Sequence, residues 1–177
     1  MITIRQERPA DIAAREALLD ASFGEGRYLK TSERLREGRL PADDLSFAAS
    51  DGGHLIGTAR LWHISAGPDC PALLLGPVAV DPRWRGRGIG SSLVRRALRD
   101  ARRHGHRAML LVGDAPYYGR FGFSADRTGA LWLPGPFERH RLLAQELVPD
   151  ALARARGRIT ATGRAVPERT PSELIAA

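Results

Sequence analysis

The sequence contains only one cysteine and only one lysine among its 177 residues. The lone thiol of Cys70 excludes an internal disulfide and a metal site built from several cysteines. No apolar stretch approaches the roughly 20 residues needed to cross a bilayer, and no basic start followed by an apolar core suggests a secretory leader. We therefore expect a cytoplasmic protein with no membrane partner and no metal.

Positive charge is abundant and is carried almost entirely by arginine, since Lys30 is the only lysine and the net charge is +7. A basic surface can bind nucleic acid without sequence preference. However, the chain shows no helix-turn-helix, zinc-finger or stacking-aromatic pattern. Nucleic-acid binding is therefore kept only as an alternative, in which charge alone would hold the partner.

Length and composition fit one globular domain. The chain is 43% hydrophobic and 27% charged, and 177 residues can bury one core but are few for two. We expect a single domain over residues 1–177, with a core over about 2–150 and a C-terminal extension over 151–177. In this extension we expect a strand near 158–162 and irregular chain from Pro167 and Pro171 onward.

A strand, a helix and a second strand are predicted between residues 73 and 112. The apolar runs 73–80 and 108–112 lack the alternation of apolar and polar residues that marks a strand with one solvent-exposed face. We therefore interpret them as buried parallel strands. Between them, apolar residues recur on one helical stripe, at Ile89, Leu93, Val94, Ala97, Leu98 and Ala101. The helix is expected to end at His104 and Gly105, because glycine terminates helices well.

The remaining pattern places further strands and helices on both sides of this unit. A hairpin is predicted at residues 51–53, where Asp-Gly-Gly separates two apolar segments. The other predicted strands cover 2–5, 45–50, 54–64, 131–133 (ending in a turn at 134–136) and 142–148, and the other helices cover 12–21 and 31–38.

The loop before the predicted helix has three glycines at alternate positions, namely Gly86, Gly88 and Gly90. Glycine lets the main chain approach a ligand closely, and a helix N-terminus offers unpaired N–H groups and partial positive charge. Three arginines surround the same opening: Arg83, Arg85 and Arg87. We predict a phosphate or diphosphate site here; the alternative is an ordinary tight turn.

The loop does not fit the common nucleotide motifs. A nucleoside-triphosphate loop would need a lysine, and a dinucleotide fingerprint would need glycine where Ser91 stands. The loop does match Arg-x-x-Gly-x-Gly, at Arg85, Gly88 and Gly90. With this motif, the strand before it and the later segment 117–123 (Tyr-Tyr-Gly-Arg-Phe-Gly-Phe), the chain resembles the GNAT superfamily of acyl-CoA-dependent N-acyltransferases.

The resemblance covers about residues 2–150 and is most specific over 75–123; segment 134–147 also resembles one bacterial branch of the superfamily. It implies an α/β (α+β) fold: a mixed, mostly antiparallel twisted sheet with a central splayed parallel strand pair, flanked by helices. It also implies transfer of an acetyl group from acetyl-CoA to a primary amine by direct attack in a ternary complex. The residues expected to hold acetyl-CoA are Val78, Ala79, Val80, Arg85, Gly86, Arg87, Gly88, Ile89, Gly90 and Ser91.

The predicted central strand is interrupted at Gly76 and Pro77. Proline cannot donate to a strand ladder, so a bulge or local splay is expected there. In the family that the chain resembles, this strand parts from its parallel neighbour and the slot takes the pantetheine arm, which would pair here with the main chain of Val78 and Val80. Without a ligand, the same irregularity would be a simple bulge.

The resemblance also implies a role for Tyr118, which lies four residues before Gly122. A tyrosine at this position can protonate the leaving thiolate, because a weakly acidic hydroxyl can donate as negative charge builds on sulfur. The alternative is that Tyr117 and Tyr118 only pack against the nearby phenylalanines. We prefer packing for Tyr117 and the acid role for Tyr118.

The general base and the acceptor amine are left open by the sequence. Asp114, His63 and Asp81 are candidate bases by position only, and ordered water could serve instead. The acceptor pocket is expected from residues 23–31, which include Tyr28 and Lys30, and from the segment before Leu131, near Trp132. A catalytically silent acyl-CoA sensor would keep the same loop, and the chain could pair with a second copy of itself.

Overall fold

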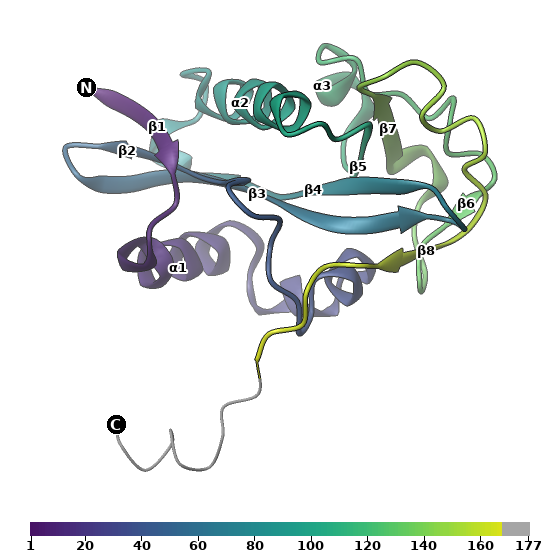
Figure 1. The fold of residues 1–177 in the computed structure, drawn as a ribbon. Helices are drawn as coiled ribbons and strands as arrows, with labels where there is room; N and C mark the ends of the chain where they lie inside the picture. The colour runs from purple at the N-terminus through teal and green to yellow at the C-terminus, as the bar shows by residue number, and fades with distance from the viewer. Residues whose placement is uncertain (168–177) are drawn as a thin grey trace.

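In the computed structural model, which describes residues 1–167, a mixed eight-stranded sheet has helices on both faces (Figure 1). The strands are β1 (Ile2–Gln6), β2 (Ser46–Asp51), β3 (His54–Ala66), β4 (Pro71–Val80), β5 (Ala108–Val112), β6 (Leu131–Trp132), β7 (Leu142–Glu146) and β8 (Gly157–Ala161). The α-helices are α1 (Ile12–Phe23), α2 (Ile89–Arg103) and α3 (Ala115–Gly119). Short 3₁₀ helices are η1 (Pro9–Asp11), η2 (Glu25–Leu29), η3 (Thr31–Leu35), η4 (Pro82–Trp84) and η5 (Arg139–Arg141).

The strand order is β1-β2-β3-β4-β5-β7, and all neighbours in this order are antiparallel except β4 and β5. The long strand β3 pairs with β2 along its first half and with β8 near its end, while β8 also pairs with β6. The predicted fold class, a mostly antiparallel mixed sheet with a central parallel pair, is therefore confirmed.

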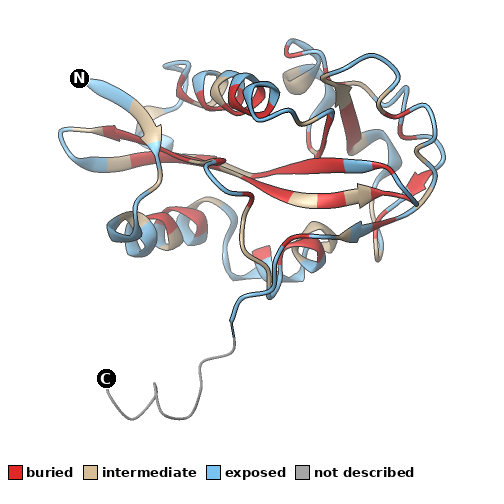
Figure 2. Cartoon of the chain, viewed as in Figure 1, coloured by how far each residue is buried: buried red, intermediate tan, exposed pale blue. Residues whose placement is uncertain are grey.

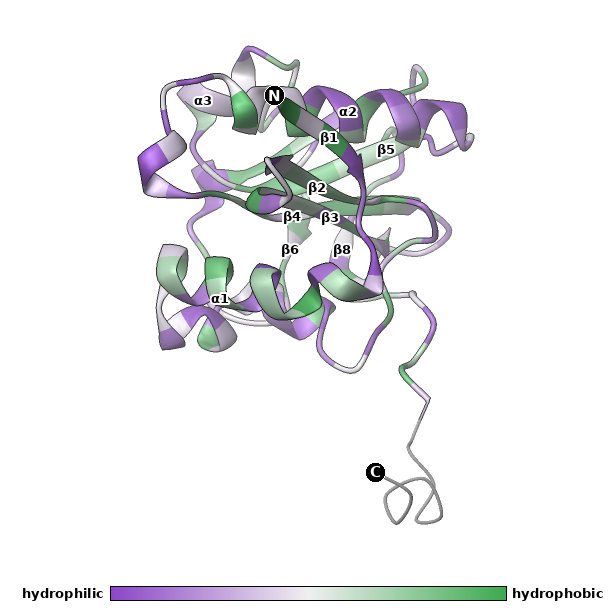
Figure 3. Ribbon diagram, turned by 90° about the vertical axis from the view of Figure 1, so that its left-hand side faces the viewer, coloured by the Kyte–Doolittle hydropathy of each residue, from purple (hydrophilic) through white to green (hydrophobic). Residues whose placement is uncertain are grey.

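Helices α2 and α3 lie on one face of the sheet, and α1 with the 3₁₀ segments that follow it lies on the other (Figures 1 and 3). The apolar stripe predicted for α2 is buried against the sheet at every one of its six positions. Buried residues follow the central strands and the inner side of α2 (Figure 2). The helix ends as predicted, with Gly105 at φ +77° just after it.

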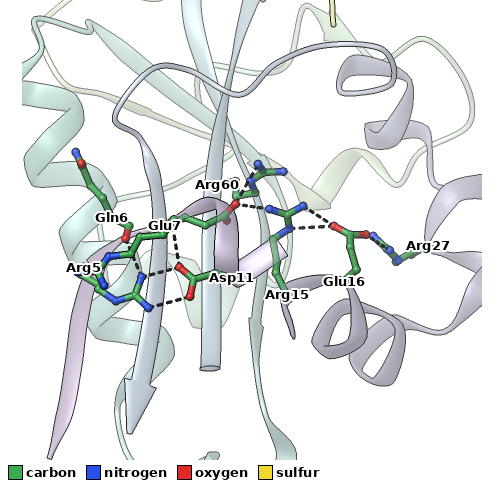
Figure 4. A network of polar contacts seen from close by, with 9 residues as sticks. Arg5, Gln6, Glu7, Asp11, Arg15, Glu16, Arg27 and Arg60 are labelled. Atoms are coloured by element: carbon green, nitrogen blue, oxygen red, sulfur yellow. Dashed lines mark hydrogen bonds and ion pairs between the residues drawn. The ribbon is translucent and has the colours of Figure 1, made fainter. Parts of the chain in front are cut away.

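Helix α1 is held as much by charge as by apolar contact. Of its apolar residues, only Leu18 and Leu19 are buried. Its buried Arg15 pairs with Glu7, which also lies 3.3 Å from Arg60 of β3. Arg15 also pairs with Glu16 at 2.8 Å, and Glu16 pairs with Arg27 of η2 at 2.5 Å (Figure 4). These ion pairs tie α1 both to the sheet and to η2.

Several predicted elements differ from the structure in extent. The helix expected over 31–38 is only the 3₁₀ segment Thr31–Leu35, and Gly38 follows with φ +65°. The last predicted strand, 142–148, ends at Glu146, because its partner β5 begins opposite that residue. The strand expected near 158–162 is confirmed as β8. The expectation for Pro171 lies outside the described residues.

Candidate functional site

The parallel strands β4 and β5 separate soon after they pair. Their register contains only Leu73 opposite Met109 and Leu74 opposite Leu110. Strand β4 continues to Val80, and within the described residues its edge beyond Leu74 has no strand partner on the β5 side. The predicted splay is thus confirmed, and it exposes main-chain groups of β4 to a slot between the two strands.

The splay coincides with the irregularity predicted at Gly76 and Pro77. Ala59 of β3 lies opposite Val78, but Leu61 lies opposite Leu75, so β4 carries one extra residue at this point. The indole Nε1 of Trp62 donates to the Gly76 carbonyl at 2.6 Å, which anchors the bulge from the side of β3. Val78, Ala79 and Val80 lie just beyond it and pair with β3.

The glycine loop leads from β4 into α2. Gly86 and Gly88 have φ values of +77° and +76°, which only glycine adopts easily, and no atom lies within 4 Å of the position a side chain would take on either. The first hydrogen bond into the helix is donated by Ser92 N to Gly88 O at 2.9 Å. The amides of residues 89–91 precede it and lie at the open end of the helix, where an anion is favoured.

Gly90 differs from the other two glycines of the loop. A Cβ there would lie 2.9 Å from the Tyr117 hydroxyl and 3.6 Å from Val80 Cγ2. Tyr117 of α3 thus packs close to the first turn of α2. The flanking arginines are exposed: Arg83 pairs with Asp81 at 2.8 Å, and Arg87 lies over the Trp84 ring.

Tyr118 lies on α3 at the end of the slot. Its ring packs edge-on against Tyr117 and Phe123, with centroids 4.9 and 6.1 Å apart. Burial, with a smaller contribution from Tyr117, raises the pKa of Tyr118 to about 12, so its hydroxyl stays protonated at neutral pH. Asp114 caps this short helix by accepting from the Tyr117 amide at 3.2 Å.

A cavity of about 1060 Å³ opens where β4 and β5 separate. Tyr118 and the bulge of β4 form one side of it. The rest of its lining comes from Phe23, from the 3₁₀ segments η2 and η3 with Arg36, from residues 112–114, and from Leu133, Pro136, Phe137, Glu138 and Arg141. A cavity of this size can hold a small organic substrate.

The acceptor pocket was only partly predicted from the sequence. Segment 23–31 does line the cavity, including Lys30. Tyr28 does not, and the other wall comes from residues after Leu131 rather than before it; Trp132 is half exposed on β6. The wall formed by the residues after β6 was not predicted, because its position depends on the pairing of β6 with the distant strand β8. This segment meets η3, where the Thr31 hydroxyl donates to the Pro136 carbonyl.

Two of the three candidate bases lie away from the cavity. Asp81 caps η4 and is held by Arg83, whose hydrogen bonds lower the pKa of Asp81. His63, on β3, lies beside His106 with the ring centroids 5.4 Å apart and the rings tilted. Asp114 does line the cavity, as do Glu33 and Glu138, which the sequence pattern did not single out.

Other chemistry that the chain could carry has little support. Cys70 is buried, its thiol donates to the Ala151 carbonyl at 3.4 Å, and burial raises its pKa, which makes it a poor nucleophile. Within residues 1–167, His, Cys, Asp and Glu side chains form no group suited to a metal ion. No helix in the same part of the chain is long and apolar enough to span a bilayer.

Comparison with known proteins adds to this geometry. A family model described as the acetyltransferase (GNAT) family matches residues 13–123. The uncharacterized N-acetyltransferase YhbS of Escherichia coli K12 is 31% identical over 150 residues, which are 84% of this chain and 89% of that protein.

Solved structures show the same similarity. The crystal structure of E. coli YhbS in complex with CoA superposes with a TM-score of 0.77 at 30% identity, covering 91% of this chain and 89% of that one. A GNAT family acetyltransferase from Brucella melitensis, in complex with acetyl-CoA, has a TM-score of 0.65 at 24% identity and covers 97% of both chains. At this lower identity, the second similarity supports the fold alone.

Proposed function

The chain belongs to the acetyltransferase (GNAT) family, and from this premise we propose that it transfers an acetyl group from acetyl-CoA to a primary amine. The observation that carries the proposal is the continuity of three features. Strand β4 lines the cavity beside Tyr118 from Leu74 to Val78, has no strand partner on its β5 side beyond Leu74 within residues 1–167, and brings Val80 against Gly90 at the start of α2.

The residues of this slot fit coenzyme A. The amides at the start of α2 and the open space before Gly86 and Gly88 suit a diphosphate, and the surrounding arginines add positive charge. The free edge of β4 suits the amide-containing pantetheine arm, which can hydrogen-bond to Val78 and Val80 as an added strand would. In the E. coli relative of known structure, CoA is present in the crystal.

Acetyl-CoA supplies an activated acetyl group as a thioester. The cavity would hold the amine so that its nitrogen attacks the carbonyl carbon directly. The C–N bond forms as the C–S bond breaks, Tyr118 gives its proton to the leaving sulfur, and the amine passes a proton to water in the cavity. Both substrates are bound together, and no acyl group is transferred to the protein, in keeping with the burial of Cys70.

The assignment of the acid to Tyr118 rests on its position and its protonation. Tyr118 lines the cavity, whereas Tyr117 does not. Its high pKa keeps the proton in place until a basic thiolate develops beside it. Arg141 opposes this rise in pKa, so its positive charge would also stabilise the tyrosinate after the proton has left.

The proposal is tested by calorimetry with acetyl-CoA, followed by a screen of primary amines in which release of free CoA thiol is measured. We expect micromolar binding and thiol release that depends on the amine. Binding of acetyl-CoA without turnover on any amine would instead indicate an acyl-CoA sensor. Failure to bind acetyl-CoA, together with nucleic-acid binding that weakens steeply with salt, would overturn the assignment.

A further inference from the structure

The lining of the cavity contains more arginine and lysine residues than acidic residues. Within the described residues, the lining includes the five cations Arg27, Lys30, Arg34, Arg36 and Arg141, and the three carboxylates Glu33, Asp114 and Glu138. The glycine loop, residues 85–91, is not part of this lining. The diphosphate expected at the loop therefore does not account for the positive charge of the cavity.

Two of the five cations are already satisfied by the protein. Arg27 pairs with Glu16 at 2.5 Å, as part of the network that fixes α1 (Figure 4). It also pairs with Asp20 at 2.8 Å. Arg34 donates to the carbonyl of Pro134 at 2.5 Å. These two side chains hold the walls of the cavity together, and they leave Lys30, Arg36 and Arg141 to be explained.

Arg36 is the most unusual of the three, because its side chain is only 8% exposed. Its Nη2 lies 3.0 Å from Glu33 and 3.2 Å from the Ser32 hydroxyl, which are its only polar side-chain contacts among the described residues. Its Nε is buried with no hydrogen-bond partner in the part of the chain that the structure describes. A buried charged donor without an acceptor is costly, so the contacts with Glu33 and Ser32 leave this guanidinium only partly satisfied.

Arg36 also lies beside the bulge of β4. A side chain at Gly76, on the bulge where β4 leaves β5, would lie 3.9 Å from Arg36 Nη1. The guanidinium thus borders the same stretch of β4 that the thioester would follow.

Lys30 and Arg141 add two further positive charges to the lining of the same cavity. Neither of them takes part in an ion pair within residues 1–167, and Lys30 Nζ lies 4.5 Å above the Phe23 ring. Burial and the charges of Arg36 and Arg141 lower the pKa of Lys30, which reflects how close the three cations are to one another. Like charges brought together in a cavity favour the entry of an anion.

We propose that the acceptor is a primary amine that also carries an anionic group, a carboxylate or a phosphate, and that Arg36, Lys30 and Arg141 bind this group. The inference rests on the proposed function and names its substrate class. Arg36 Nη1 makes no hydrogen bond within the described residues and lies beside Gly76 of the cavity wall, and a guanidinium hydrogen-bonds planar carboxylates and phosphates well. Binding of the anion beside the bulge would present the amine to the slot.

The test measures binding and turnover separately. In the presence of CoA, calorimetry compares N-acetyl-L-alanine with its amide, and N-acetyl-O-phosphoethanolamine with N-acetylethanolamine, so that each pair differs only in the anionic group. We expect at least one anionic compound to bind about 10-fold or more tightly than its neutral match. The two pairs distinguish a carboxylate from a phosphate ligand.

Variants then locate the site. Arg36→Gln and Lys30→Gln should each remove most of the preference for the anionic compound, whereas Arg103→Gln, on the exposed face of α2, should leave it intact. If the buried Arg36→Gln variant does not fold, Lys30→Gln and Arg141→Gln, at less buried positions, carry the test. Equal binding of both members of both pairs to the wild-type protein would overturn the inference.

Thiol release with the corresponding free amines is measured in parallel. Higher kcat/KM for L-alanine than for L-alaninamide, or for O-phosphoethanolamine than for ethanolamine, supports the inference together with the proposed function. Preferential binding of an anionic compound without any turnover would remove the proposed function and leave the anion site standing. The two failures are thus distinguishable.

Discussion

The ring of Tyr118 lies directly against the main chain of Gly113: a Cβ at position 113 would come within 2.4 Å of Tyr118 Cε2 and 2.7 Å of its Cδ2. These contacts involve the ring rather than its flexible end. The absence of a side chain at the end of β5 therefore determines how closely the phenol approaches the slot. The first two predictions follow from this contact.

Replacement of Gly113 by alanine should displace the Tyr118 ring and lower kcat. We expect a loss of about 10-fold, since small misplacements of an acid are costly, with little change in the affinity for acetyl-CoA. Steady-state kinetics and calorimetry on Gly113→Ala check both values. Gly129→Ala is a suitable control, because no atom lies within 4 Å of a Cβ there. If Gly113→Ala retains the full kcat, the contact has no catalytic importance.

Removal of the Tyr118 hydroxyl should slow turnover while the ring still packs. For Tyr118→Phe we expect kcat to fall about 100-fold with an unchanged Kd for acetyl-CoA, because a proton donor to the leaving group is lost. Tyr117→Phe, at a residue that does not line the cavity, should remain close to wild type. The double variant Gly113→Ala/Tyr118→Phe should be no slower than Tyr118→Phe; additive losses would indicate that Gly113 acts by another route.

The glycine loop offers a matched pair for testing the diphosphate site. Gly88 and Gly105 have φ values of +76° and +77° at opposite ends of α2, and both face open space. Alanine at either position should cost about 1 kcal/mol of stability, because both positions need the left-handed conformation. Only Gly88→Ala places a methyl group before the open amides, so only this variant should weaken CoA binding, by about 10-fold on calorimetry. Equal affinities in the two variants would argue against the site.

Acid should weaken the contact between β1 and η1. Arg5 donates two hydrogen bonds to Asp11, at 2.6 and 2.8 Å, and with the Arg8 amide it lowers the pKa of Asp11 to about 2. Since this pKa lies below the value in the unfolded chain, near 3.9, the stabilisation is complete above pH 4 and is lost as the pH falls toward 2.

The Asp11→Asn variant should therefore be less stable than wild type by up to about 2 kcal/mol at pH 7, and the difference should shrink between pH 4 and 2. Urea unfolding of wild type and Asp11→Asn at pH values from 7 to 2 measures this difference in the free energy of unfolding. Asp43→Asn breaks an ion pair with Arg164 in which both side chains are more than two-thirds exposed, and it should have little effect. A constant difference between wild type and Asp11→Asn down to pH 2 would contradict the linkage.

Much of the scaffold of the slot could be predicted from local patterns. The stripe on α2 and the capping by Gly105 depend on residues near in sequence, and the break at Pro77 follows from its missing N–H group. The approach of Gly113 to Tyr118 could not be predicted, because it depends on how α3 folds back over the end of β5. The closeness of Gly90 to the Tyr117 hydroxyl could not be predicted either, because it depends on the same placement of α3.

The clustering of cations at the cavity could not be predicted for a related reason. Arg36 and Arg141 are two of many arginines in a strongly basic chain, and nothing in their sequence neighbourhoods sets them apart. Only the tertiary structure brings them, from segments far apart in sequence, to one cavity with Lys30. Burial of a charge is a property of the fold and not of the residue type.

The last strand also bears on how the molecule is made. Strand β8 pairs with Ile64–Ala66 near the end of β3 and also with β6. The cavity wall that contains Leu133 and Phe137 follows β6, so its position depends on residues 157–161. During synthesis, β3 is complete about a hundred residues before this partner emerges from the ribosome, and such distant pairings form slowly. A nascent chain that has just passed α2 therefore has its glycine loop but lacks one wall of the cavity.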